Sequence, residues 1–379
     1  MYELKRKNIM SFKKISNTPN HYAWGDYDSI SNFTNQKPSG EPEAELWLGT
    51  HESNPSKLED GTSLDSIVNL PFLVKLLAAK QPLSIQVHPN KAQAEIGFDV
   101  ETIKGLNLDN ASRNYRDNNH KPEMIIALED NFKALCGFQK SSLVLRTVNI
   151  LKLNVKGKHV RTFNRLSDML LESTGKGYKK IVKKILKRKF GKKLVRAIES
   201  ALLRTNNVNL IEIRNLKFIA KHYPHDIGLA VALLLNHVSL DKGQVLYLPA
   251  GNVHAYLKGF GLEVMANSDN VIRAGLTPKN IDVEELLKIS DFSVLDEPLL
   301  QGEVFEYGRR WSPISDFNVT EIDNGNIEVN VQGKPTIVVA EENSTVKLSD
   351  TLHHMNKGEC AIILDEHLVT LKGKLYFIN

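Results

Sequence analysis

The stretch Gly243-Gln-Val-Leu-Tyr-Leu-Pro-Ala-Gly-Asn-Val-His254 is the most informative segment of the chain. Its first half has the residue types of a short β-strand that opens on a glycine. Pro249 and Gly251 then predict a tight turn, because proline fixes one backbone angle and glycine allows left-handed ones. His254 stands just beyond this turn. We expect the turn to swing His254 inward from the mouth of a β-barrel, where its imidazole can bind a metal.

A second segment, Ser84-Ile-Gln-Val-His-Pro89, carries further metal-binding residue types. Gln86 and His88 are separated by one residue on a predicted strand, so their side chains share one face. Glu95 lies too far along the chain, and Glu123 in Asn119-His-Lys-Pro-Glu-Met124 is the better carboxylate candidate. Two histidines, one carboxylate and one amide make a four-ligand set with nitrogen and oxygen donors. Zinc is the common cation for such a set, and a position would stay open for water or substrate.

Length and composition describe an ordinary globular protein. The chain has 379 residues, of which 41% are hydrophobic and 25% charged, and its formal net charge is +5. Cys136 and Cys360 cannot build a disulfide framework, which favours a reducing compartment. No apolar run follows the basic residues near the start, so we expect no signal peptide. The apolar stretch 227–238 is too short to span a bilayer and predicts a buried helix. We therefore expect a cytoplasmic protein.

The pattern of apolar residues and turn signals changes twice along the chain. From about residue 15 to 138, short strand-like runs such as Glu45–Leu48 alternate with turn signals. Residues 142–222 contain no proline and repeat apolar residues at helical spacing, which predicts a helical insertion. Strand-like runs return at Val245–Leu248, a short helix is expected from Pro278 to Ile289, and residues 300–379 are again β-rich. The predicted fold class is mainly β with an α insertion.

The segments just quoted resemble type I mannose-6-phosphate isomerases, also called phosphomannose isomerases, of the cupin superfamily. Lys258 stands where the generic second cupin motif ends in asparagine, which leaves the metal-binding histidine untouched. The resemblance is carried by Tyr22-Ala-Trp-Gly25, Glu43-Ala-Glu-Leu-Trp-Leu-Gly49, Leu83–Asn90, Asn119–Met124, Leu248–Tyr256 and Gly261–Lys279.

The resemblance implies a cupin (jelly-roll) barrel with an inserted helical domain and a C-terminal β domain. In this sequence the catalytic cupin domain would comprise residues 1–140 and 226–298. The helical insertion would be 141–225, and the C-terminal cupin-like β domain would be 299–379.

The resemblance also implies site residues and a cofactor. One zinc ion per chain would be held by Gln86, His88, Glu123 and His254, and the catalytic arginine of the family falls on Arg273. The positions that match the substrate pocket are Ser84, Lys75, Lys121, Tyr256, Glu263, Asp269 and Lys279.

The implied reaction interconverts mannose 6-phosphate and fructose 6-phosphate through an ene-diolate. Arg273 suits the stabilisation of that negative charge, because the pKa of arginine is too high for proton shuttling. The base stays open among His120, Glu263, Asp269 and a metal-bound water. The substrate phosphate would meet Lys75, Lys121 or Lys279 with the Ser84 hydroxyl.

Between Lys176 and Arg196 the chain has eleven Lys or Arg residues and no acidic residue. We interpret this stretch as a solvated helix face rather than a polyanion-binding face. Two other functions stay open: an Fe(II) oxygenase of the cupin type, and a non-catalytic cupin that binds sugar or RNA. We expect a monomer that binds a small sugar phosphate, without a nucleic-acid or membrane partner.

Overall fold

The computed structural model describes residues 11–379 apart from 111, 173–176, 188 and 207–208. The chain forms two compact units. Unit 1 contains the chain up to Ala78, with Leu262–Asn267 and Leu300–Asn379. Unit 2 contains Ala79–Gly261 and Ser268–Leu299. Strand β10 (His254–Ala266) begins in unit 2 and ends in unit 1.

Unit 1 is built around an antiparallel sheet with the strand order β12-β13-β14-β19-β15-β18-β1-β3, to which the hairpin β16–β17 adds at β19. The strands of this sheet are β1 (Phe12–Ser16), β3 (Lys57–Leu58), β12 (Glu303–Phe305), β13 (Gly308–Trp311), β14 (Val319–Asn330), β15 (Thr336–Ala340), β16 (Ser344–Leu348), β17 (Thr351–Met355), β18 (Cys360–Ile363) and β19 (Leu368–Ile378). Alternating apolar side chains such as Val346, Leu348, Val369 and Leu371 form its core. Unit 1 also contains α1 (Ser29–Phe33), the 3-10 turn Leu64–Ser66, and the pair β2 (Glu45–Leu48) and β4 (Phe72–Ala79), of which only Ala79 falls in unit 2.

The strands of unit 2 carry the segments that contain most of the candidate site residues. They are β5 (Ile85–Val87), β6 (Glu123–Ala127), β7 (Phe132–Phe138), β8 (Leu235–Leu240), β9 (Val245–Leu248), the first part of β10, and β11 (Ile272–Gly275). β5 lies between β10 and β11, while β6 pairs with β9 and β7 pairs with β8. All these pairings are antiparallel, so distant segments meet in fixed register.

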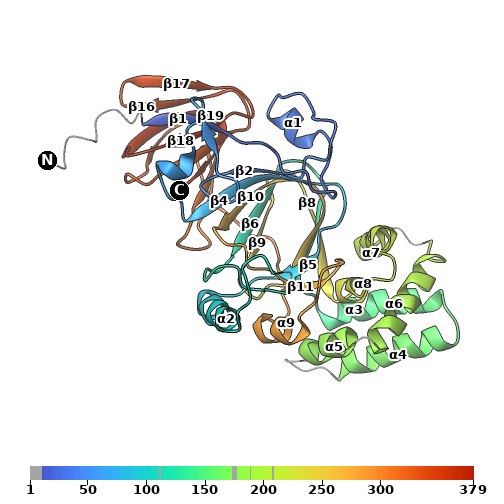
Figure 1. The fold of residues 1–379 in the computed structure, drawn as a ribbon. Helices are drawn as coiled ribbons and strands as arrows, with labels where there is room; N and C mark the ends of the chain where they lie inside the picture. Colours follow the sequence, from blue (N-terminus) through green and yellow to red (C-terminus); the bar gives the residue numbers. More distant parts are fainter. Residues whose placement is uncertain (1–10, 111, 173–176, 188, 207–208) are drawn as a thin grey trace. The chain divides into compact units, whose positions relative to one another are not determined.

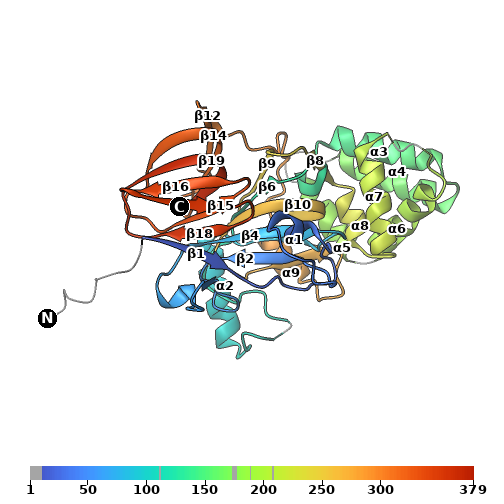
Figure 2. The same cartoon turned by 90° about the horizontal axis from the view of Figure 1, so that it is seen from above.

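The helices of unit 2 include a group formed by one continuous part of the chain. Figures 1 and 2 show α3–α7 gathered side by side. The helices are α2 (Lys91–Ile103), α3 (Ser141–Leu153), α4 (Lys158–Leu171), α5 (Gly177–Leu186), α6 (Lys189–Leu202), α7 (Ile211–His222), α8 (Gly228–Ala232) and α9 (Val283–Ile289). In α4 the residues Phe163, Leu166 and Leu170 recur at helical spacing and are buried. One apolar face per helix therefore builds the shared core, and most charged residues lie outside it, although Glu101 of α2 and Glu212 of α7 are buried.

Two element predictions differ from the structure. The apolar stretch 227–238 is not one buried helix: α8 ends at Ala232, and β8 begins at Leu235 and pairs with β7. A continuous apolar run fits a buried strand as well as a buried helix, so its pattern could not separate the two. The helix expected from Pro278 starts only at Val283, because the Asp282 side chain accepts a hydrogen bond from the Glu285 N–H and caps it there.

The helices found between residues 141 and 222 agree with the helical texture of that part of the sequence. The division of the chain into segments at 140, 225 and 298 stays a prediction. No helix among the residues that the structure describes is long and apolar enough to cross a membrane.

Candidate metal centre

Three side chains that the sequence singled out converge in unit 2. His88, Glu123 and His254 each offer one ligand atom, and these atoms lie within 4.8 Å of one another. Nε2 of His88 is 3.4 Å from Glu123 Oε1, and Nε2 of His254 is 3.2 Å from Glu123 Oε2. Each of the three residues is only 1% exposed. Such a buried group of nitrogen and oxygen donors has the composition of a metal site.

Strand register explains how residues so far apart in the sequence meet. Gln86 on β5 pairs with His254 on β10 and, across its other edge, with Arg273 on β11. Residues directly opposite in a sheet project to the same face, so these three side chains form one cross-strand row. The Gln86 amide nitrogen lies 3.4 Å from His254 Nε2. His88 follows β5 directly, and Glu123 is the first residue of β6.

The predicted Pro-Gly turn has the required backbone. Asn252 N–H donates to the Pro249 carbonyl at 3.1 Å, and Gly251 has a φ of 83°, which favours glycine. Gly251 N–H also donates to the His88 carbonyl at 2.9 Å. The turn therefore sets the start of β10, where His254 stands, and fixes it against the other histidine segment.

Hydrogen bonds at the far side of each ring orient both histidines. Nδ1 of His88 lies 2.6 Å from the Asn270 carbonyl, and Nδ1 of His254 lies 2.9 Å from the Asn252 carbonyl. A carbonyl can only accept, so each Nδ1 carries a proton and each ring turns Nε2 toward Glu123. Burial lowers the pKa of His88 to about 4, against the opposite effect of Glu123, which keeps this ring neutral near pH 7.

Without a cation, the electron-rich atoms of these side chains would repel one another. A neutral Nε2 lone pair and a carboxylate oxygen repel, and His88 Nε2 and Glu123 Oε2 are buried without a hydrogen-bond partner in the described part of the chain. A divalent cation among them would accept all these lone pairs, with the Gln86 side chain beside them. Histidines that are held at Nδ1 by carbonyls are the usual outer arrangement of zinc ligands. The residues present therefore fit a zinc ion.

Lys121 adds a buried positive charge to this centre. Its Nζ lies 3.0 Å from Glu123 Oε1, and its side chain is 9% exposed. Burial alone would raise the pKa of Glu123, but the positive charge of Lys121 holds that pKa well below its usual value. Glu123 is therefore a carboxylate, as a metal ligand must be.

A second group of cations surrounds Arg273. Arg273 is half-buried, and its pKa is lowered by burial and by Arg116. Lys279 is exposed, and its pKa is lowered by Arg273 before burial and Arg116 contribute. No ion pair joins any of the three to a described residue. Three cations that affect one another electrostatically and have no ion pair to a described residue favour an anion among them.

Lys75 and Glu263 lie in unit 1, where they form a buried ion-pair group. Lys75 Nζ is 3.5 Å from Glu263 Oε2 and 3.6 Å from Glu45 Oε1, and it stands 4.9 Å above the Trp47 ring. From the sequence we expected Lys75 among the possible phosphate ligands and Glu263 among the possible bases. The structure instead pairs these two side chains with each other.

The other predicted pocket residues occupy different environments. Ser84 is half-buried just before β5, and His120 is half-buried in the segment before Lys121. Tyr256 is buried on β10, with its ring edge-on to Phe132 at 5.5 Å. Asp269 is exposed, and its N–H donates to Asp117 Oδ2 at 2.7 Å.

Sequence reasoning missed Asn270, which connects two parts of this centre. Its side-chain amide accepts from Arg116 N–H at 2.7 Å and donates to the carbonyls of Asp117 and Asn119 at 2.9 and 2.8 Å. Its own carbonyl orients His88. Asn270 thus holds the segment that leads to His120 and Lys121. Asn270 lies within the segment Gly261–Lys279 quoted above, but a single asparagine in a sequence does not indicate such contacts.

Comparison with known proteins identifies relatives of the whole chain. The family model described as "Phosphomannose isomerase type I, catalytic domain" matches residues 12–69 and 62–141. The mannose-6-phosphate isomerase of Escherichia coli K12 is 33% identical over 95% of this chain and 97% of its own length. A probable mannose-6-phosphate isomerase of Caenorhabditis elegans is 32% identical over 93% of this chain and 90% of its own.

Solved structures agree with these matches. The mannose 6-phosphate isomerase of Salmonella typhimurium, solved with fructose 6-phosphate and zinc bound, is 31% identical, covers 97% of this chain and 99% of its own, and has a TM-score of 0.86. A zinc-bound mannose 6-phosphate isomerase matches with the same identity, coverage and score. These likenesses confirm the fold class predicted above, mainly β with a helical insertion. Over nearly its full length, this chain belongs to the type I phosphomannose isomerase family.

Proposed function

We propose that this protein interconverts mannose 6-phosphate and fructose 6-phosphate at a zinc site formed by Gln86, His88, Glu123 and His254. One observation carries the metal assignment. Two buried histidines, each held at Nδ1 by a backbone carbonyl, turn Nε2 toward the carboxylate of Glu123. Family membership supplies the reaction, because the relatives named above are mannose-6-phosphate isomerases.

The chain's own residues divide the remaining tasks. When bound, zinc supplies a Lewis acid that stabilises negative charge on the sugar oxygens. Arg273 stands in the same cross-strand row as Gln86 and His254, so its guanidinium serves the ene-diolate that forms between C1 and C2. Lys279 and Arg116, which are exposed beside it, receive the phosphate dianion. Lys121 keeps Glu123 ionised.

For proton transfer we propose His120 as the base. Glu263 is engaged with Lys75, and Asp269 is exposed to solvent, where a carboxylate is a weak base. His120 belongs to the segment that Asn270 fixes, directly before Lys121. A positioned base contributes roughly 10²- to 10⁴-fold to such a step. His120→Asn should therefore lower kcat by that order and leave zinc content unchanged.

A coupled isomerase assay with metal analysis tests the proposal. Purified protein should contain about one zinc per chain, lose activity with a chelator, and regain it when zinc is added back. Full turnover in protein without metal would refute the zinc site. Stoichiometric zinc without any turnover of either sugar phosphate would refute the proposed reaction.

A further inference from the structure

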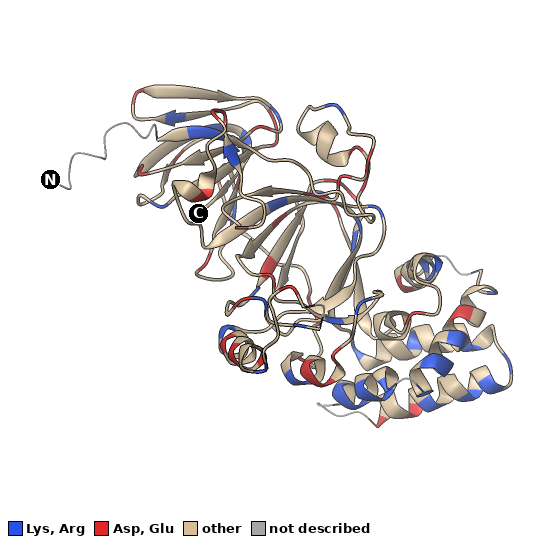
Figure 3. Ribbon diagram, viewed as in Figure 1, with Lys and Arg blue, Asp and Glu red and all other residues tan. Residues whose placement is uncertain are grey.

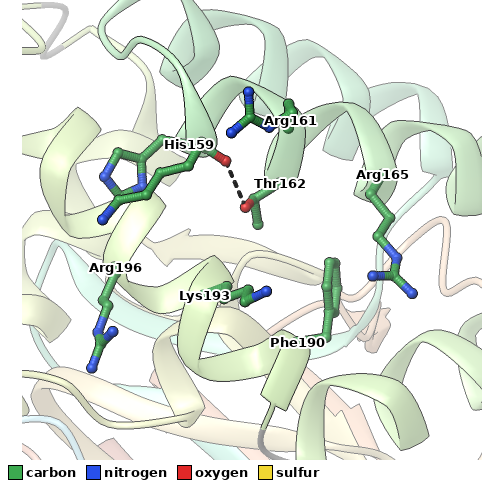
Figure 4. A pocket seen from close by; sticks show the side chains of 8 residues that line it. His159, Arg161, Thr162, Arg165, Phe190, Lys193 and Arg196 are labelled. Carbon is green, nitrogen blue, oxygen red and sulfur yellow. Dashed lines mark hydrogen bonds between the residues drawn. The ribbon is translucent and has the colours of Figure 1, made fainter.

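A groove in the helical part of unit 2 gathers cations from two helices. It lies between α4 and α6 and has a volume of about 390 Å³. Figure 4 shows the side chains that surround it, and Figure 3 shows how Lys and Arg residues follow these helices. The residues that matter here are Lys158, Arg161 and Arg165 from α4, and Phe190, Lys193 and Arg196 from α6.

Helical spacing explains why these cations face one another. Lys158, Arg161 and Arg165 are three and four residues apart, which places them along one side of α4. Lys193 and Arg196 have the same relation on α6. The two helices pack together, so the two basic stripes border one groove.

The charges in the groove are not neutralised within the described residues. None of the five cations has an ion pair there, and Arg165 instead stands 5.4 Å over the Phe190 ring. The pKa of His159, which also lines the groove, is lowered by burial and then by the charges of Lys158 and Arg204. Like charges without counterions repel, so this surface gains free energy when an anion binds.

We propose that this groove binds a compact polyphosphate, either inorganic or the phosphate chain of a nucleoside triphosphate. Three guanidinium groups offer the paired N–H donors that match phosphate oxygens, and the lysines add point charges. The volume lies in the range of small-molecule sites. The Thr162 hydroxyl donates to the Lys158 carbonyl at 2.9 Å, so recognition is left to the cations.

A compact ligand fits better than a nucleic-acid strand. Single strands are held by successive aromatic side chains that stack on the bases. Phe190, the aromatic residue of this groove, is buried, and Arg165 and Lys184 stand over its ring at 5.4 and 5.9 Å. Recognition therefore rests on the phosphate charge. None of the groove residues belongs to the proposed zinc site, so the two sites can be tested separately.

The test is a titration of the zinc-loaded full chain with inorganic tripolyphosphate. The groove variant is Arg161→Gln with Lys193→Gln. The matched control is Lys180→Gln with Lys183→Gln on α5, which removes the same charge from exposed positions outside the groove. Loss of two charged contacts should weaken tripolyphosphate binding at least about tenfold in the groove variant. The control should stay within about twofold of the parent protein.

Several results would overturn the proposal. Equal weakening in both variants would show general attraction to a basic surface. Unchanged binding in the groove variant would show that the polyphosphate binds elsewhere. If saturating fructose 6-phosphate then displaced the polyphosphate, its binding site would be the cations around Arg273. Tighter binding of a short single-stranded RNA that depends on Lys180 and Lys183 would favour a nucleic-acid surface.

A second arm separates the two sources of phosphate. Adenosine triphosphate and tripolyphosphate are titrated in parallel, with adenosine as the control. Binding of either polyphosphate through Arg161 and Lys193, without binding of adenosine, supports the proposal and identifies which source binds more tightly. Binding of adenosine alone would contradict it.

Discussion

The candidate metal centre and the groove between α4 and α6 both collect ionisable side chains, but they hold them differently. At the metal centre His88 and His254 are buried, and a backbone carbonyl fixes each ring. In the groove Arg161, Lys193 and their neighbours are exposed and lack counterions among the described residues. The first site depends on the position of each atom, whereas the second depends on summed charge. A single substitution should therefore abolish the function of the metal centre, whereas in the groove it should weaken anion binding only in part.

The largest effect is expected from His254→Ala. The variant loses a proposed ligand that is buried and held at Nδ1 by the Asn252 carbonyl. We expect activity to fall at least about a thousandfold, with loss of the bound zinc. Elemental analysis and the coupled assay measure both. Lys258→Ala, which changes an exposed residue of the same strand, is a control for general damage. A variant at His254 that keeps both zinc and turnover would remove this residue from the site.

Arg273→Ala should have the next largest effect. Removal of one preorganised donor lowers kcat by roughly 10²- to 10³-fold, while KM changes much less and zinc content stays the same. Arg273→Lys should recover only part of the activity, because an ammonium keeps the charge and loses the planar fork. Steady-state kinetics on both sugar phosphates provide the measurement. If KM carried most of the loss, Arg273 would instead be a phosphate ligand.

Asn270→Ala tests positioning without touching a ligand side chain. The variant keeps the carbonyl that orients His88 but releases the segment from Arg116 to Asn119. Outer-shell changes of this kind cost roughly 10- to 100-fold. We expect this loss in kcat/KM, together with a changed pH profile, and only a minor change in zinc affinity by chelator competition. Zinc loss with an otherwise normal profile would assign Asn270 to metal retention instead.

The smallest effect is expected from the exposed lysines of α5 and its surroundings. Replacing Lys180, Lys183, Lys187 and Lys192 by Gln should leave kcat nearly unchanged, because these side chains are exposed and summed charge acts only at long range. At low salt KM can rise modestly, and added salt should remove the difference. A hundredfold fall in kcat with the fold intact would show that this region contributes to the reaction directly.

Some features were predictable because short spacing rules determine them. The strands Glu45–Leu48 and Val245–Leu248 have the bounds expected from their residue types. The turn at Gly251 follows from local preferences of proline and glycine. The family and its fold class, both expected from sequence motifs, are confirmed by the relatives. The meeting of His88, Glu123 and His254 agrees with the expected ligand set, and their roles stay a prediction.

Other features depend on contacts that no local pattern carries. The pairing of Lys75 with Glu263 arises because two strands bring distant residues together. The hydrogen bonds of the Asn270 side chain need the exact path of a loop. The sequence showed only a run of lysines and arginines and gave no sign of the groove. The other side of the groove is formed by α4, which lies outside that run. Lys176 and Arg188 of this run lie outside the described residues.

The ligands also have a consequence for the chain as a polymer. Glu123 and His254 stand on opposite sides of the helices α3–α7 in the sequence. An ion held by both residues ties the two ends of that long excursion together, as a covalent cross-link would. Such a tie removes conformations from the unfolded chain, and its entropic effect grows only slowly with loop length. The helices between the ligands would then unfold from a closed loop, and the midpoint of thermal unfolding would follow the concentration of free metal.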